Sequence, residues 1–181
     1  MAVQPLADNP FWDFSVALYA NETIAQQCQA LQDDWDADVN LLLYGIWLAH
    51  FGIDWPIDDI KKMQAEFEPW RKVALIPLRT VRRRLRFQTR RRYYNFLKNL
   101  ELRAERYQQD RLWLICSADY TTQQLSEPVS DDLFQPLLKK NLHAYLQRLE
   151  MRPRPEPMHP KVDEQLEILF AAVIMQRASS N

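Results

Sequence analysis

Glycine is unusually scarce in this sequence. Only two glycines, Gly45 and Gly52, occur among 181 residues, whereas ordinary usage is about 7%. Folds that need many turns with positive φ are therefore hard to build, and helices are favoured. The same scarcity excludes the phosphate loop G-x-x-x-x-G-K-[ST] and the dinucleotide turn G-x-G-x-x-G, because both use glycine to bring backbone N–H groups close to phosphate.

Cysteine and histidine are also sparse, which leaves few ligands for a transition metal. Cys28 and Cys116 stand far apart and outside any C-x-x-C arrangement, so the sequence offers neither a zinc ribbon nor a disulfide framework. The histidines at 50, 143 and 159 occur singly, without an H-E-x-x-H signature. We expect no metal site, no cofactor and reduced thiols.

Long hydrophobic runs are missing as well. No stretch approaches 18 uninterrupted apolar residues, and the first ten residues resemble no signal peptide. We therefore expect a cytoplasmic protein without a membrane span. The length and the 47% hydrophobic content suffice for one sizeable core. We expect a single helical domain over 1–150, a proline-rich linker over 151–160, and a C-terminal helix over 161–178 that docks on the domain or on a partner.

The apolar residues that are present recur with helical spacing and predict an all-α bundle of about seven or eight helices. Residues 39–51 are apolar on every side and end at Gly52, so we expect them to form a buried central helix. Gly45 and Ala49 leave a flat surface on it where another helix can approach closely. Asn40, if buried, must be hydrogen-bonded. The other expected helices are about 10–20, 22–34, 57–67, one that begins at Pro69 and is kinked by Pro77, 89–116, 131–149 and 161–177.

Charge is distributed unevenly, although the net charge is only −1. Residues 1–70 hold twelve acids and two lysines, whereas residues 71–111 hold fourteen lysines and arginines and three acids. Such asymmetry indicates either an anionic partner or two segments of one chain that neutralise each other. The net negative charge of residues 1–70 and the net positive charge of residues 71–111 nearly cancel. This favours ion pairs within the chain over binding of an acidic protein partner or of nucleic acid.

The arginines between Arg79 and Arg92 are the sharpest candidate for a binding surface. On a helix they lie opposite a narrow apolar stripe, and guanidinium groups bind phosphate and carboxylate. Tyr93 and Phe96 lie nearby, and aromatic side chains beside arginines suit single-stranded nucleic acid. The candidate basic face consists of Arg79, Arg82, Arg83, Arg86, Arg90 and Arg91.

Glu101 and Glu105 form a candidate carboxylate pair. They lie one helical turn apart, where like charges repel by roughly a few tenths of a kcal/mol, so something must compensate them. Arginines from the preceding helix are the simpler partners. A metal ion is the alternative, and it would need further ligands from other helices.

Six tryptophans are many for this length, and tryptophan is enriched at interfaces. We expect Trp12 and Trp47 to be buried. Trp35, Trp55 and Trp70 fall near expected helix ends, where partial exposure would suit recognition of a partner.

Several short motifs, in order along the chain, resemble an uncharacterised family of proteobacterial cytosolic proteins, a domain of unknown function. They are FWDFS at 11–15, LQ at 31–32, DVNLLL at 38–43, PLR and RR within 77–83, and ELRAER at 101–106. The similarity covers roughly 11–112 and implies no established activity. Where the family pattern has a glycine shortly before DVN, this chain has the acid-rich stretch 33–38.

These patterns favour a non-enzymatic interaction or regulatory protein. We expect it to bind another protein through the arginine face, the tryptophan-rich helix ends or the last helix. Binding of RNA or single-stranded DNA through the arginine face is the alternative, and a metal-dependent enzyme that uses Glu101 and Glu105 is a third hypothesis. The protein-binding and the nucleic-acid-binding hypotheses both lose support if the acidic N-terminal segment covers the arginines.

Overall fold

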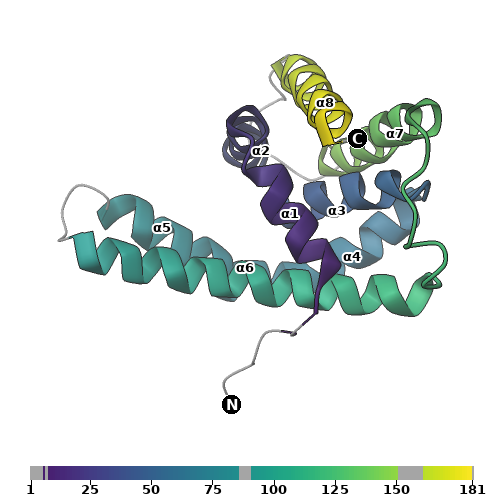
Figure 1. Ribbon diagram of the computed structural model, residues 1–181. Coiled ribbons are helices and arrows are strands. Elements are labelled where there is room, and N and C mark those ends of the chain that lie inside the picture. Colours follow the sequence, from purple (N-terminus) through teal and green to yellow (C-terminus); the bar gives the residue numbers. More distant parts are fainter. Residues whose placement is uncertain (1–5, 7, 86–90, 151–160, 181) are drawn as a thin grey trace.

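The computed structural model describes residues 6, 8–85, 91–150 and 161–180, and within these ranges it contains helices and no strand (Figure 1). The predicted all-α fold class is confirmed. The elements are α1 (Pro10–Tyr19), α2 (Glu22–Trp35), α3 (Val39–His50), α4 (Ile57–Trp70), the π-helical turn η1 (Arg71–Leu75), α5 (Ile76–Leu85), α6 (Arg91–Asp119), α7 (Asp131–Glu150) and α8 (Lys161–Ser180). None of the described helices combines the length and the apolar character that crossing a membrane requires.

Helix α3 is the buried centre of the bundle, as its apolar sequence predicted. Ten of its twelve residues are buried, and α1, α2, α6 and α7 pack around it. The Asp38 carboxylate caps its N-terminus by accepting a hydrogen bond from Asn40 N at 2.9 Å. Gly52 follows its C-terminus with φ of 72°, a left-handed conformation that glycine adopts without a steric penalty.

The predicted close approach at Gly45 is made by α7. A Cβ atom on Gly45 would lie 3.1 Å from Leu142 Cδ2 and 3.3 Å from the ring of Trp55. Beside this contact, the buried Asn141 amide donates to Gly45 O at 3.2 Å and to Ile53 O at 3.0 Å. Glycine therefore lets the two helices come close enough for a side-chain amide to bond the opposite backbone.

Pro69 and Pro77 lie inside a continuous helical run. The prediction that a helix begins at Pro69 was wrong, because α4, η1 and α5 follow one another without a break. In the π-helical turn, Ile76 N donates to Arg71 O, five residues earlier. Proline lacks an N–H, and its ring collides with the carbonyl four residues before it, so a wider turn ahead of Pro77 accommodates it within the helix.

Helix α8 packs against α2 and α7 and buries apolar residues of its own: Val162, Leu166, Leu169, Phe170, Ala172 and Val173. Near its C-terminus, Arg177 donates to Asp131 and Val129 and contacts His50. The proline-rich segment expected over 151–160 lies outside the described residues. The last helix is therefore placed on the bundle by its own side chains.

Tryptophan burial differs from the expectation at three positions. Trp47 is buried as predicted, but Trp12 is only half-buried. Trp35 and Trp55 are both 2% exposed, although they lie at or near helix ends. Both belong to the hydrophobic core of the bundle. Of the three tryptophans proposed for partner recognition, only Trp70 keeps partial exposure.

Candidate functional site

Helix α5 and the first part of α6 form an antiparallel pair that extends away from the rest of the bundle (Figure 1). We call residues 76–85 and 91–103 the arm. Helix α5 contains no buried residue, and the first buried residue of α6 is Glu101. The arm is therefore a two-helix layer with little core of its own.

A cluster of ion pairs, here called the arginine clasp, holds the two helices of the arm together. Arg79 donates to Glu101 at 3.2 Å and to Glu105 at 3.4 Å. Arg82 donates to both oxygens of Glu101 and to the hydroxyl of Tyr94 at 3.4 Å. Arginines of the preceding helix thus compensate the two glutamates. Because Glu101 is buried, removing both arginines would leave its charge uncompensated.

The acidic N-terminal segment engages two further arginines. Arg83 pairs with Asp33 of α2, and the buried Arg71 pairs with Asp36 and with Glu68. The charges that the sequence shows to be nearly equal are therefore partly neutralised by contacts within the chain.

The six arginines of the candidate basic face consequently fall into three groups. Arg79, Arg82 and Arg83 make the ion pairs described above. Residues 86 and 90 lie outside the described part of the chain. Arg91 is exposed and forms no ion pair with another described residue. The basic face is not a continuous open row, and half of its predicted members bind the chain's own acids.

A buried network of amides and carboxylates joins the base of the arm to α3. Asp38 accepts a hydrogen bond from Gln108 Nε2 at 2.7 Å, and its backbone N–H donates to the hydroxyl of Tyr145 at 2.7 Å. Asn40 donates to Gln108 at 3.1 Å and accepts from Gln109 at 2.9 Å. Asn40 is thus buried and hydrogen-bonded, and the network fixes the register of α6 on α3.

Two carboxyl groups near this network have raised pKa values. Burial raises the pKa of Glu105 to about 7, while the Arg79 guanidinium opposes that shift. Burial also raises the pKa of Asp38, against the lowering effects of its bond from Gln108 and of the charge of Arg71.

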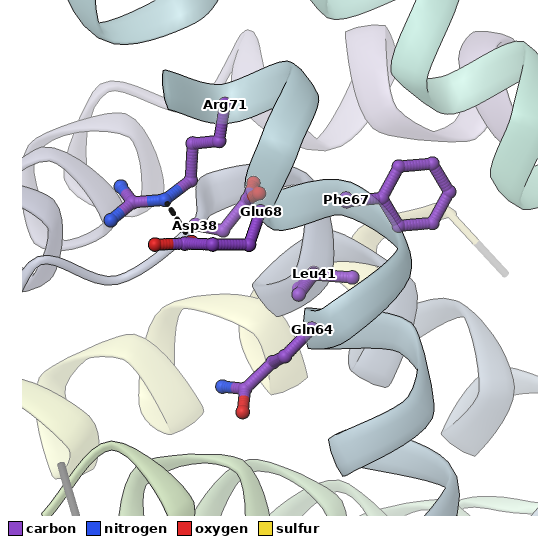
Figure 2. A pocket seen from close by; sticks show the side chains of 6 residues that line it. All are labelled: Asp38, Leu41, Gln64, Phe67, Glu68 and Arg71. Carbon is purple, nitrogen blue, oxygen red and sulfur yellow. Dashed lines mark hydrogen bonds and ion pairs between the residues drawn. The ribbon is translucent and has the colours of Figure 1, made fainter. Parts of the chain in front are cut away.

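A small cavity lies beside Asp38, and Figure 2 shows its lining side chains. Its volume of about 10 Å³ leaves room for about one water molecule. Sites for small organic ligands occupy roughly 300–1,000 Å³, so this cavity does not fit such a ligand. The lining residues are Asp38, Leu41, Gln64, Phe67, Glu68 and Arg71.

The carboxylate pair offers no arrangement for a metal ion in the described part of the chain. Glu101 and Glu105 face arginines, and no group of three or more histidine, cysteine, aspartate or glutamate side chains gathers among the described residues in a way that could hold a metal. The role that the geometry gives the two glutamates is to bind α5.

An exposed apolar stripe on the arm is the feature that sequence analysis missed. Tyr93 and Phe96 were noted in the sequence as aromatic side chains near the arginines, and they are 51% and 61% exposed. On α5, Val81 is 42% exposed. These residues recur with helical spacing, but no helix among the described residues covers them as a third layer. A signal was available, because α5 carries too few large apolar residues to cover the aromatic side chains of α6.

Comparison with known proteins identifies the family of the chain. Residues 10–112 match a family model described as a protein of unknown function (DUF2390). The match covers more than half of the chain and includes the arm and its base. No curated protein and no solved structure gives a significant match. The chain therefore belongs to the DUF2390 family.

Proposed function

We propose that this protein is a non-enzymatic, cytosolic protein-binding module and that its partner docks on the arm. The observation that carries the proposal is the exposed stripe formed by Val81, Tyr93 and Phe96. Large apolar side chains that gather on a surface mark interaction sites, and aromatic residues and arginine are enriched at the centres of protein interfaces.

The arginines of the arm fall into two groups, and this supports the proposal. One group stabilises the arm, and the other is exposed to a partner. Arg79 and Arg82 stabilise the arm through Glu101 and Glu105. Other arginines of the arm, Arg84, Arg91, Arg92 and Arg103, are exposed and form no ion pair with a described residue. These side chains are available to a partner.

The cytosolic part of the proposal is supported by the cysteines. Cys28 and Cys116 are both free and buried, and unpaired cysteines are typical of reducing compartments. The raised pKa of the Cys28 thiol, caused by burial, also disfavours the reactive thiolate.

Binding of single-stranded nucleic acid is the second candidate function. Arg92 lies over the ring of Tyr93 at 4.9 Å, and arginines beside exposed aromatic rings suit stacking of bases. This candidate has less support, because Arg79, Arg82 and Arg83 are engaged within the chain. A metal-dependent enzyme has the least support, because arginines hold both glutamates.

Site-specific photo-crosslinking tests the proposed function. Val81 or Phe96 is replaced by the photoreactive residue p-benzoylphenylalanine, and the full chain is irradiated in lysate of the source cells. We expect a discrete adduct that protease removes and nuclease does not, and that disappears when Tyr93→Ser is added.

The matched control places the same photoreactive residue at Leu133 of α7, which is 57% exposed and lies outside the arm. Equal protein adducts from positions 96 and 133, or none from the arm, would contradict the proposal. An adduct from the arm that nuclease removes would favour the nucleic-acid candidate instead.

A further inference from the structure

One side of α6 extends the stripe from the arm toward its base. The exposed Tyr93 and Phe96 and the half-buried Leu100 and Tyr107 follow along α6 at spacings of three, four and seven residues, which is one face of a helix. At the base of the arm, Trp70 contacts the ring of Tyr107 at a centroid distance of 4.5 Å and donates to Ala104 O at 3.1 Å. Trp70 therefore joins this face of α6 to the helical run that leads into α5.

Helix α5 adds two exposed apolar residues to this part of the arm. Pro77 and Val81 lie four residues apart, at helical spacing, and both are exposed. Arg83, two residues beyond Val81 and so about 200° around the helix, points to Asp33 of α2. The apolar surface consequently opens on the side of the arm that faces away from α2.

The shape of this surface fits a helix. From Tyr93 to Tyr107 the stripe extends over fourteen residues, or about 21 Å, which is the length of about four helical turns. Two antiparallel helices leave a seam between them, and a third helix packs into such a seam with residues at i, i+3, i+4 and i+7. The backbone groups of both arm helices are bonded within their own helices, so an extended strand would find no hydrogen-bonding edge.

The charge beside the stripe fits an acidic occupant. Arg84 follows Val81 by three residues, and Arg103 lies between Leu100 and Tyr107 at spacings of three and four. Both side chains are exposed, and neither forms an ion pair with a described residue. Arginine binds carboxylate through paired hydrogen bonds, so each end of the stripe offers a site for an acidic side chain.

The same charges disfavour a second copy of the arm. Two arms packed face to face would bring Arg84, Arg92 and Arg103 of both copies together, and like charges at a contact destabilise it. Nucleic acid would satisfy the arginines but would leave the aliphatic part of the stripe, Pro77, Val81 and Leu100, without an apolar partner.

We infer that the partner which docks on the arm presents an acidic amphipathic α-helix, and that this helix lies along Val81, Phe96 and Leu100 as the third helix of the arm. The inference rests on the proposed function and specifies the chemistry of the partner. The apolar face of the incoming helix covers the stripe, and its acidic residues bind Arg84 and Arg103.

Binding of designed peptides tests the inference on the full-length protein. The probe is a labelled 18-residue helix former with leucine at i, i+3, i+4 and i+7 and glutamate at exposed positions. Its two comparison peptides carry glutamine in place of glutamate, or the same composition in scrambled order. Fluorescence anisotropy at about 50 and about 150 mM salt measures the dissociation constants. We expect the acidic helix to bind at least about tenfold more tightly than either comparison peptide.

Variants of the arm assign the binding to the stripe and its arginines. Phe96→Ser should weaken binding about tenfold, and Arg84→Gln with Arg103→Gln should weaken it and reduce its dependence on salt. Lys98→Gln is the matched charge control, because position 98 lies two residues from both Phe96 and Leu100, on another face of α6. Leu133→Ser controls for loss of an exposed apolar side chain. Both controls should bind as the wild type does.

Three outcomes would overturn the inference. In the first, the scrambled peptide binds as tightly as the acidic helix. In the second, Phe96→Ser and the double arginine variant bind unchanged. In the third, a uridine oligonucleotide binds more tightly than the peptide and displaces it. If arm-specific protein adducts form in the crosslinking experiment while the peptides show no preference, the proposed function stands and the acidic helix is the wrong partner.

Discussion

Glu105, at the base of the arm, carries a carboxyl group whose ionisation opposes folding. Burial is the main cause of its raised pKa of about 7, the charges of Glu101 and Asp38 add to it, and Arg79 offsets part of it. In the unfolded chain the same group ionises near 4.5. The folded protein therefore binds more protons between these two values, and this contribution to stability is lost as the pH rises through about 7.

Glu105→Gln tests this assignment. The variant removes the buried ionisation, so we expect its free energy of unfolding at pH 8 to exceed that of the wild type by about 1 kcal/mol. The expected gain in stability is smaller than the full pKa shift of Glu105 would give. The Glu105 side chain is 29% exposed, and glutamine in its place loses part of the interaction with Arg79. Urea unfolding of both proteins at pH 5 and pH 8 measures the difference. An equal pH dependence in the two proteins would contradict the role assigned to Glu105.

Gly52 is the residue whose backbone most restricts substitution. Its φ is 72°, and an added Cβ would lie 2.7 Å from Cγ1 of Val129. Gly52→Ala should therefore cost roughly 1–2 kcal/mol for the left-handed conformation, with a further cost for displacing Val129. Thermal unfolding measures the total.

A second variant separates the two costs at Gly52. Val129→Ala removes the nearest atom, so Gly52→Ala should be less harmful in that background than in the wild type. An equal loss in both backgrounds would show that the conformation of Gly52, and not contact with Val129, sets the cost.

At the scale of elements, one side chain near the C-terminus of α8 makes several polar contacts with the rest of the bundle. Arg177 donates to Asp131 at 2.8 Å and to the backbone carbonyl of Val129, contacts Nδ1 of His50 at 2.7 Å, and lies 4.3 Å from the ring centroid of Phe134. Burial first, and the charge of Arg177 second, lower the pKa of His50 to about 4. This corner joins α8 to α7 and to the end of α3.

Arg177→Met keeps the aliphatic part of the side chain and removes these bonds. We expect a loss of about 2 kcal/mol in stability, faster amide exchange in α8, and a higher pKa for His50, because a nearby positive charge is removed. Hydrogen exchange and an NMR titration of the His50 ring measure the last two effects. A variant whose His50 pKa stays unchanged would contradict the electrostatic role of Arg177.

The helices themselves were largely predictable, because each follows from local chemistry. The apolar period and Gly52 predicted the bounds of most helices within a few residues, and in the structure Asn9 and Asn21 cap α1 and α2 through their side chains. The prediction at Pro69 was wrong because a proline can either begin a helix or lie within a distorted one. The π-helical turn through which the helix continues past Pro69 depends on packing, which the local sequence does not show. Trp35 and Trp55 misled the prediction because burial at a helix end depends on the direction of the chain beyond that end.

At the scale of the whole molecule, the arm should be its least protected helical part. Helix α5 buries no residue, and α6 buries none before Glu101. Opening the arm therefore exposes little apolar surface, whereas opening α3 exposes the core. We expect amides of 76–85 and 91–100 to exchange at least about tenfold faster than those of 104–116 within the same long helix.

Hydrogen exchange followed by mass spectrometry or NMR tests this gradient, and α3 provides the internal reference. The acidic helical peptide should slow exchange in the arm and leave α3 unchanged. Uniform protection along α6 would contradict the view that the arm lacks a core.

The candidate site was only partly predictable, because charge counts do not assign partners. The sequence indicated that arginines would find acids within the chain, and the structure pairs Arg79 and Arg82 with the glutamates of α6 and Arg83 with the acidic segment. The exposed stripe was harder to predict for a different reason. A helical period shows that Tyr93 and Phe96 share a side of α6, but whether another helix covers that side depends on the arrangement of the whole bundle.

The first part of the long helix α6 belongs to the arm and the rest packs on the bundle, so one rigid helix connects the two. Its 29 residues extend over about 43 Å, and the bonds of Gln108 and Gln109 to α3 lie close to its midpoint. A tilt of about 5° around that point moves the two ends by about 2 Å in opposite directions. Shifts of this size repack helix interfaces. A partner that tilted the arm by this amount would therefore also displace the far end of α6, where the segment leading to α7 begins.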